Sequence, residues 1–290
     1  MLSAKSISAG RNNRSANKNE TGKLDFMNAR ARSIPLESAT PQIETVTPQT
    51  QTGCAACGAY EPNLCQAVFK ASWSLPQTES IEFQKSAHVV PARRIVFRQN
   101  DLPDAVPVIC EGWAASIVML SDGSRQILSF LLPGDIVSTA LLFDARAHCF
   151  VEAITEVRYR TFKRNELRAV LLKQPNLFDV LSKAWIEEKN RSDQIIVDLG
   201  RRSADERIAR LILGLAKRLT QRSMTRTVGE SGLEMDFPLR QHHIADASGL
   251  TPVHVSKVLS EFRRAGLTKI SDRSLTIVDQ IGLRRIANMR

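Results

Sequence analysis

Residues 241–267, QHHIADASGLTPVHVSKVLSEFRRAGL, carry the pattern of two short helices joined by a tight turn. If the first of these residues begins a helix, Ala245 supplies the small side chain that closely crossing helices need, and Gly249 supplies a left-handed turn. Thr251 and Pro252 then start the second helix, because threonine caps free amide groups and proline needs no amide partner in the first turn. Apolar residues occupy the positions that a buried seam requires, namely Ile244, Leu250, Val255 and Val258. The stretch therefore predicts a helix-turn-helix of the DNA-binding kind.

The second helix of this stretch is expected to read DNA with its outward face. Helix geometry turns the apolar seam inward and leaves four residues facing out near the helix start: Val253, His254, Ser256 and Lys257. A lysine donates to guanine or to phosphate, a serine bonds to a phosphate or a base edge, and a valine makes only apolar contact, for example with a thymine methyl group. Phosphate contacts are expected at the helix ends, from Gln241, Arg263 and Arg264. The alternative for each of these residues is an ordinary solvated position.

The positive charge of the chain is concentrated toward its C-terminus. The 290 residues carry 40 Lys and Arg against 30 Asp and Glu, and residues 201–290 hold 17 of the former against 9 of the latter. Lysine and arginine gain affinity for nucleic acid by releasing the counterions condensed on its phosphates. This distribution favours a polyanionic partner, although a solvated basic face would give the same count.

Composition and periodicity divide the chain into four zones. Residues 1–50 are polar without a period, which predicts a disordered tail. Residues 51–172 contain a cysteine segment and then short β-rich runs separated by turns such as Ser121-Asp122-Gly123. Residues 173–200 and 201–290 show helical spacing, and the last zone ends in what resembles a small β-wing. We therefore expect an α+β chain with an N-terminal antiparallel β roll, a long helix and a C-terminal winged helix-turn-helix.

Neither a membrane span nor a secretory signal is expected. No apolar run approaches the roughly 18 residues that a span requires, and residues 1–23 lack the apolar core of a signal peptide. The cytoplasm is therefore the expected location, and its reducing conditions argue against disulfides among the five cysteines. The sequence has no phosphate-cradling glycine loop, metalloprotease helix or nucleophile elbow, so we expect no enzyme.

The order of tail, roll, long helix and winged helix-turn-helix resembles the Crp/Fnr family of bacterial transcription regulators. The resemblance covers about residues 54–290 and is carried by four motifs: Pro133-Gly134-Asp135, Pro175-Asn176-Leu177, SADERIA at 203–209 and GLTPVHVSKVL at 249–259. It implies a homodimer that pairs along the long helix and places two recognition helices in successive major grooves of palindromic double-stranded DNA. We expect Ile195 to lie in that apolar helix seam. RNA polymerase is a further partner that the family implies.

The chain departs from the family pattern at two sites, one in the roll and one in the recognition helix. Members that bind cyclic nucleotides hold them with a Gly-Glu pair and an Arg-Ser/Thr pair, where this chain has Gly134-Asp135 and Arg146-Ala147. We therefore expect that no cyclic nucleotide binds. The Fnr and Crp branches usually place a glutamate at the position of Val253 and an arginine at that of Lys257, so the preferred half-site should differ from theirs.

The stretch CAACGAYEPNLC, residues 54–65, resembles the cysteine loop of the oxygen-sensing Fnr branch. That resemblance implies a [4Fe-4S] cluster held by Cys54, Cys57 and Cys65 together with one distant cysteine. Zinc on the same thiolates is the rival chemistry, because a C-x2-C spacing suits a tetrahedral site equally well.

The fourth cluster ligand departs from the family. The family's distant cysteine falls where this chain has Arg158-Tyr159-Arg160, so Cys149 is the expected ligand and Cys110 is the other candidate. Ordinary packing is the alternative for both, since free cysteine is among the most buried residue types.

Two functions follow from these observations. The first is a sequence-specific DNA-binding regulator that responds to oxygen or redox state through the cluster. The second is a small-molecule-binding or signal-independent regulator of the same fold, with a zinc or vestigial cysteine site. Iron-sulfur absorption at about 400 nm in anaerobically purified protein would distinguish them.

Overall fold

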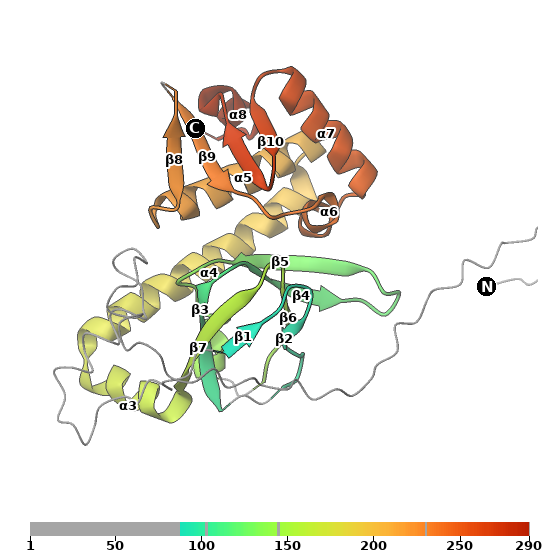
Figure 1. Ribbon diagram of the computed structural model, residues 1–290. Helices are drawn as coiled ribbons and strands as arrows, with labels where there is room; N and C mark the ends of the chain where they lie inside the picture. Colours follow the sequence, from blue (N-terminus) through green and yellow to red (C-terminus); the bar gives the residue numbers. More distant parts are fainter. Residues whose placement is uncertain (1–87, 102–103, 144–145, 230, 290) are drawn as a thin grey trace, which may run out of the picture. The chain divides into compact units, whose positions relative to one another are not determined.

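The computed structural model describes residues 88–101, 104–143, 146–229 and 231–289. Strands fill the first part of this region, and helices with a second, smaller sheet fill the rest, so the fold is α+β as predicted (Figure 1). The predicted tail and the three cysteines of the 54–65 loop lie outside the described residues. No helix of the described region is long and apolar enough to cross a membrane.

The β roll consists of two antiparallel sheets. Their strands are β1 His88–Val90, β2 Ile95–Phe97, β3 Ala105–Glu111, β4 Ala114–Met119, β5 Arg125–Leu131, β6 Phe150–Ala153 and β7 Val157–Lys163. One sheet has the order β1-β7-β3 and the other the order β2-β6-β4-β5. Ala114 of β4 pairs with Leu131 on one side and with Ala153 on the other, which places β4 inside its sheet. Aliphatic residues of both sheets bury one another in a common core.

Tight turns connect the strands where the sequence places glycine. Gly112, between β3 and β4, has a φ of 82°, and an added Cβ would lie 2.0 Å from the carbonyl oxygen of Glu156. Only glycine fits both requirements. The predicted turns at Ser121-Asp122-Gly123 and Pro133-Gly134-Asp135 are also present, each with its glycine at positive φ.

Two helices follow the roll, α3 Arg164–Lys173 and α4 Pro175–Arg201. Pro175 stands at the first turn of α4, where its missing N–H has no consequence. The 27 residues of α4 span about 40 Å. Leu177 and Leu181 bury its first turns in the core of the roll, and the Thr139 hydroxyl donates a 2.6 Å hydrogen bond to the Glu188 carboxylate. The first half of the long helix is thereby fixed to the roll.

The apolar side chains of α4 lie on two different faces. Trp185 and Ile196 are 62% and 69% exposed and, with Phe178, they follow one another along an outward stripe. Ile195 is half-buried and lines a cavity against the roll and the next helix. One step along a helix turns the side chain by about 100°, so Ile196 takes the outward position instead. The expected place of Ile195 in a dimer seam stays a prediction.

The C-terminal part combines the expected winged helix-turn-helix with a hairpin. Its elements are α5 Ala204–Thr220, β8 Thr225–Val228, β9 Gly232–Asp236, α6 Gln241–Ser248, α7 Pro252–Arg264, β10 Thr268–Ser271, β11 Ser274–Ile277 and α8 Gln280–Ile286. Ser203 starts α5 with a capping box, because its hydroxyl accepts from the Glu206 amide and the Glu206 carboxylate accepts from the Ser203 amide. The predicted wing is the pair β10–β11, with Asp272 and Arg273 at positive φ in its turn.

The β8–β9 hairpin was not expected from the helical spacing of residues 201–290. It pairs with the wing through β9 and completes a four-stranded sheet of order β10-β11-β9-β8. Leu275 and Ile277 of β11 are fully buried in the core that α5 and α7 also line. The wing is thus the outer half of a sheet that supports the helix-turn-helix.

Candidate DNA-binding site

The turn between α6 and α7 has the geometry that its sequence predicts. Gly249 ends α6 with φ 62° and ψ 42°, in the left-handed region. The Thr251 hydroxyl then accepts a 3.3 Å hydrogen bond from the His254 amide, and Pro252 begins α7. Ala245 is buried where α6 faces α7. These contacts fix the angle between the two helices, and so the direction in which α7 presents its free face.

The rear face of α7 is anchored in the core of the C-terminal part. Val255, Val258 and Phe262 are buried there together with residues of α5, β9 and α8. A helix that buries one whole face of this kind holds its opposite face in a fixed orientation. The seam that the apolar spacing predicted is confirmed.

The free face of α7 contains the residues that were predicted to read bases. Val253 is 80% exposed, and His254 and Lys257 are exposed beside it. Ser256 is half-buried, and its backbone carbonyl accepts a 2.8 Å hydrogen bond from Ser260. The structure thus brings a cation, an imidazole and an apolar side chain together at the start of one exposed helix, where recognition helices contact base edges.

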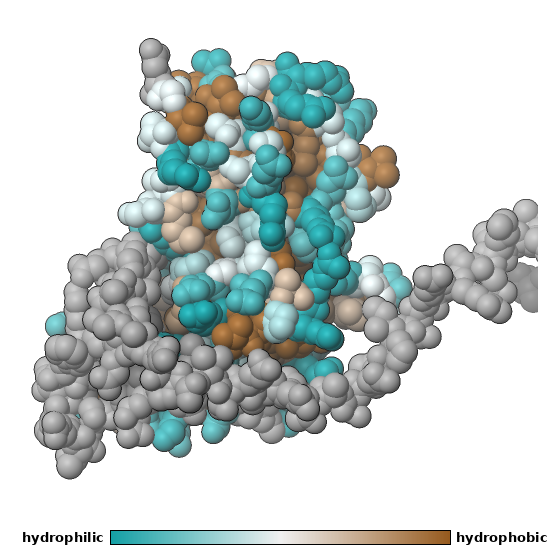
Figure 2. All heavy atoms as spheres, viewed as in Figure 1, coloured by the Kyte–Doolittle hydropathy of each residue, from teal (hydrophilic) through white to brown (hydrophobic). Residues whose placement is uncertain are grey.

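The residues predicted to contact phosphates lie at the helix ends. Gln241 is exposed at the first position of α6, and Arg263 and Arg264 are exposed in the last turn of α7. Figure 2 shows many hydrophilic side chains on the visible face of the C-terminal part, with apolar ones between them. Contact with DNA by these residues stays a prediction.

His243 has a structural role that the sequence did not reveal. It is buried in α6, and its Nδ1 accepts a 3.1 Å hydrogen bond from the Arg240 amide, which caps the helix start. Burial, followed by the charges of His242 and Arg125, lowers the pKa of His243 to about 4. The neighbouring His242 is exposed.

Several arginines connect the helix-turn-helix to the rest of the chain, and sequence reasoning missed them. Arg207 of α5 donates from Nη1 to the Ser248 carbonyl at 3.1 Å, beside the Gly249 turn. Arg125 of β5 forms ion pairs with Glu152 at 2.9 Å and with Asp246 of α6 at 3.7 Å. No local pattern marks these residues, because each partner lies far away in the sequence.

Asp135 belongs to the same set of contacts. Its carboxylate is 12% exposed, accepts from the Leu132 amide and forms ion pairs with Arg218 of α5 and with Arg222 in the turn that follows α5. Burial alone would raise the pKa of Asp135, but the two guanidinium groups and the hydrogen bonds outweigh it and hold the pKa below its usual range. Asp135 stands where cyclic-nucleotide-binding members have a glutamate, but its carboxylate is already paired with these two arginines.

The two cysteines of the described region show features of packed thiols. Cys149 is half-buried and lies 2.8 Å from the Ser116 hydroxyl, and burial followed by the nearby Glu188 charge raises its pKa. Cys110 is also half-buried, 3.8 Å from the Val108 carbonyl. A cluster ligand must be a thiolate, and the role of Cys149 or Cys110 as the fourth ligand stays a prediction. No group of three His, Cys, Asp or Glu side chains among the described residues is arranged to hold a metal.

Two family models match the chain in the order that the fold shows. Residues 87–174 match a cyclic nucleotide-binding domain, and residues 206–286 match a Crp-like helix-turn-helix domain. The solved structure of FixK2 from Bradyrhizobium japonicum is similar, with a TM-score of 0.60 at 24% identity over 69% of this chain and 96% of that one. A CooA variant from Carboxydothermus hydrogenoformans has a TM-score of 0.62 at 18% identity, over 79% of this chain and 97% of that one. These structures share the fold.

Characterised relatives extend the similarity over most of the chain. The nitrogen fixation regulation protein FixK of Bradyrhizobium diazoefficiens is 27% identical over 81% of this chain and 93% of its own length. The anaerobic regulatory protein of Haemophilus influenzae is 25% identical over 79% of this chain and 86% of its own. The relatives are transcription regulators and not enzymes. With both domains matched in order and the helix-turn-helix in place, the chain belongs to the Crp/Fnr family of DNA-binding transcription regulators.

Proposed function

We propose that this regulator binds a palindromic duplex as a homodimer and reads each half-site with the free face of α7. The observation that carries the proposal is the exposure of Val253, His254 and Lys257 on a helix whose rear face is fully packed. Lys257 donates to a guanine edge or a phosphate, and Val253 offers apolar contact to a thymine methyl group. Arg263 and Arg264 neutralise the charge of the DNA backbone beside them, and Gln241 donates a hydrogen bond to a phosphate.

The outward stripe of α4 supports the homodimer. Phe178, Trp185 and Ile196 are large apolar side chains left exposed along one face of a long helix. Two copies that pair along this stripe remove it from water and set two recognition helices on one duplex. RNA polymerase is the partner through which such a regulator acts on transcription, as the family implies.

Binding to DNA is tested by fluorescence anisotropy with the full chain and a selected palindromic duplex. The affinity should fall steeply between 50 and 200 mM salt, because several phosphate contacts release counterions. A flat dependence on salt would contradict the assignment of the basic C-terminal part to the DNA backbone.

We further propose that oxygen or redox state is the signal, through an iron-sulfur cluster bound by Cys54, Cys57 and Cys65. The support is the cysteine spacing together with relatives named as an anaerobic regulatory protein and as the activator FnrL of Cereibacter sphaeroides, which is 27% identical over 71% of this chain and 81% of its own. Three thiolates would hold one corner of a cubane, and the bound cluster would be the group that reacts with oxygen. The fourth ligand remains Cys149 or Cys110, or comes from outside the chain.

The cluster is tested by the absorption spectrum and metal content of protein made without oxygen. A [4Fe-4S] form should absorb at about 400 nm, contain about four irons per chain and bleach in air. Each of Cys54→Ser, Cys57→Ser and Cys65→Ser should remove the colour, and Cys149→Ser and Cys110→Ser identify the fourth ligand. Colourless protein with one zinc per chain would favour a structural metal, and protein with neither metal would leave the loop without a cofactor.

A further inference from the structure

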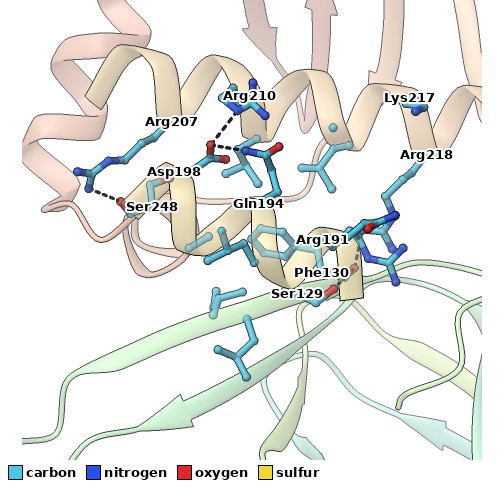
Figure 3. Close-up of a pocket in the computed structure, with 18 of the residues that line it drawn as sticks. Ser129, Phe130, Arg191, Gln194, Asp198, Arg207, Arg210, Lys217, Arg218 and Ser248 are labelled. Atoms are coloured by element: carbon cyan, nitrogen blue, oxygen red, sulfur yellow. Dashed lines mark hydrogen bonds and ion pairs between the residues drawn. The ribbon is translucent and has the colours of Figure 1, made fainter. Parts of the chain in front are cut away.

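A cavity of about 400 Å³ lies where the β roll meets the helices that follow it. Its wall comes from β5, from the second half of α4 and from α5, with Ala247 and Ser248 of the helix-turn-helix added at one side. Figure 3 shows Ser129 and Phe130 of β5 on one side and the polar side chains of the two helices on the other. Sites for small molecules commonly have this volume and lie between packed parts of a chain.

Most of the cavity wall is apolar. Its aliphatic and aromatic members include Ile127, Phe130, Ile195, Leu199, Leu211 and Leu215. These side chains come from a strand and two helices, so they surround an occupant from several directions. Such a wall favours a ligand with a hydrocarbon or aromatic body.

The charged side chains of the wall carry an excess of positive charge. The cations are Arg191, Arg207, Arg210, Lys217 and Arg218, against the carboxylates of Glu187 and Asp198. Asp198 already pairs with Arg202 at 3.0 Å and with Arg210 at 2.8 Å. Arg191 lies 3.9 Å from Glu187, and Arg218 is paired with Asp135. Figure 3 places Arg191 and Arg218 at the end of the cavity where Ser129 and Phe130 lie, and Lys217 is exposed at the rim. This end of the cavity favours an anionic group.

Gly214 keeps the α5 side of the cavity open. It stands in the middle of α5 and lines the cavity, and an added Cβ would meet nothing within 4 Å. Glycine is less favourable than alanine inside a helix, and no close neighbour requires it here. Gly214 therefore leaves free space at the cavity wall, although alanine at this position would make the helix more stable.

The cavity is on a different side of α4 from the apolar stripe that we assign to the dimer. Gln194 and Asp198 face the cavity, whereas Ile196 faces out. Two steps along a helix turn the side chain by about 200°, so a second copy seated on Ile196 leaves this face of α4 free.

We propose that this cavity is a binding site for a small amphipathic organic anion. Its apolar body lies between β5 and α5, and its carboxylate or similar group is held by Arg191 and Lys217. The site is distinct from the interior of the roll and from the free face of α7. It does not depend on whether the chain carries a metal cluster.

The test uses the full chain and the dye 8-anilinonaphthalene-1-sulfonate, which joins an apolar ring system to one anionic group and fluoresces when its surroundings are apolar. We expect one saturable dye site per chain. Gly214→Leu, which fills the cavity, should weaken that binding by at least about tenfold, because the volume is no longer free. Gly200→Leu is the matched control, since Gly200 is also a helical glycine with nothing within 4 Å of an added Cβ, but lies outside the cavity wall. It should retain the wild-type affinity.

Charge is tested at the exposed rim, where substitution leaves the packing intact. Lys217→Glu should weaken the dye site several-fold, whereas Lys183→Glu, on an exposed position of α4 outside the cavity wall, should not. Octanoate should displace the dye at a lower concentration than its neutral amide. Equal dye affinity in wild-type and Gly214→Leu protein, the lack of a saturable site, or equal displacement by octanoate and octanamide would each overturn the proposal.

Discussion

The lowered pKa of the buried His243 makes the stability of the C-terminal core depend on pH. Burial and neighbouring positive charge lower this pKa from 6.5 to about 4, so the folded chain holds the imidazole neutral while the unfolded chain protonates it near pH 6.5. The unfolded state then binds more protons between pH 6.5 and 4, and stability falls as the pH falls through that window. The loss should reach up to about 3 kcal/mol, measured by urea unfolding at a series of pH values.

His243→Gln is the matched variant for that measurement. Glutamine at this helix position still accepts a hydrogen bond from the Arg240 amide, but it does not titrate. Its unfolding free energy should be less dependent on pH between 6.5 and 4 than that of the wild type. Identical slopes in the two proteins would mean that another group causes the acid sensitivity.

Lys257 is a second single residue with a testable role, namely the preference for a specific DNA sequence. Lys257→Ala should weaken binding to the best duplex by about 1 to 3 kcal/mol, because a base contact is lost. The difference in affinity between this duplex and random DNA should therefore become smaller. Anisotropy titrations on both duplexes measure the two losses, with Lys183→Ala on α4 as a control away from the helix-turn-helix. Equal losses of binding free energy on specific and random DNA would mean that Lys257 contacts a phosphate and not a base.

At the scale of elements, the long helix α4 has a different environment on each of two faces. Neighbouring residues of similar chemistry, Ile195 and Ile196, therefore have different roles: one lines the cavity and the other lies 69% exposed on the stripe. Ile196→Asp should break the homodimer, since it places a charge in an apolar seam. Ile195→Asp should instead lower the free energy of unfolding of each protomer.

Light scattering combined with urea unfolding separates these two outcomes. A monomeric mass for Ile196→Asp with its unfolding otherwise two-state would agree with the assigned stripe. A dimeric mass for Ile196→Asp and a monomeric one for Ile195→Asp would place the interface on the other face of α4.

At the scale of the whole molecule, Asp135 connects the roll to α5. Its carboxylate neutralises two arginines, of which Arg222 is 6% exposed. Asp135→Asn leaves both guanidinium groups without their negative partner and should lower the free energy of unfolding by about 2 to 4 kcal/mol. Asp193→Asn, whose carboxylate is 53% exposed on α4, should change it by less than about 1 kcal/mol. Equal effects in urea unfolding would show that the buried pair contributes little.

Asp135 and His243 also act in different pH ranges. The depressed pKa of Asp135 means that its contribution to stability is present above the unfolded value near 3.8 and is lost as the pH falls through the lower folded value. The Asp135 contribution therefore disappears at a lower pH than the His243 window.

The sequence by itself determined the local features of this protein. The left-handed turn at Gly249, the cap at Thr251 and the capping box at Ser203 follow from residues within a few positions of one another, and all are present. The roll, the long helix and the wing could be predicted for the same reason, because their periodicity and turn residues are local. The outward face of α7 followed from that periodicity as well.

Only the tertiary structure decided which distant residues meet. The Asp135 pair with Arg218 and Arg222 joins residues more than 80 positions apart, and Arg125 reaches Asp246 across 121 positions. The side of α4 that Ile195 faces, the β8–β9 hairpin and the cavity beside Gly214 depend in the same way on how elements pack. Helical spacing shows that a face is apolar, but what covers that face is set by long-range packing, which no local pattern records.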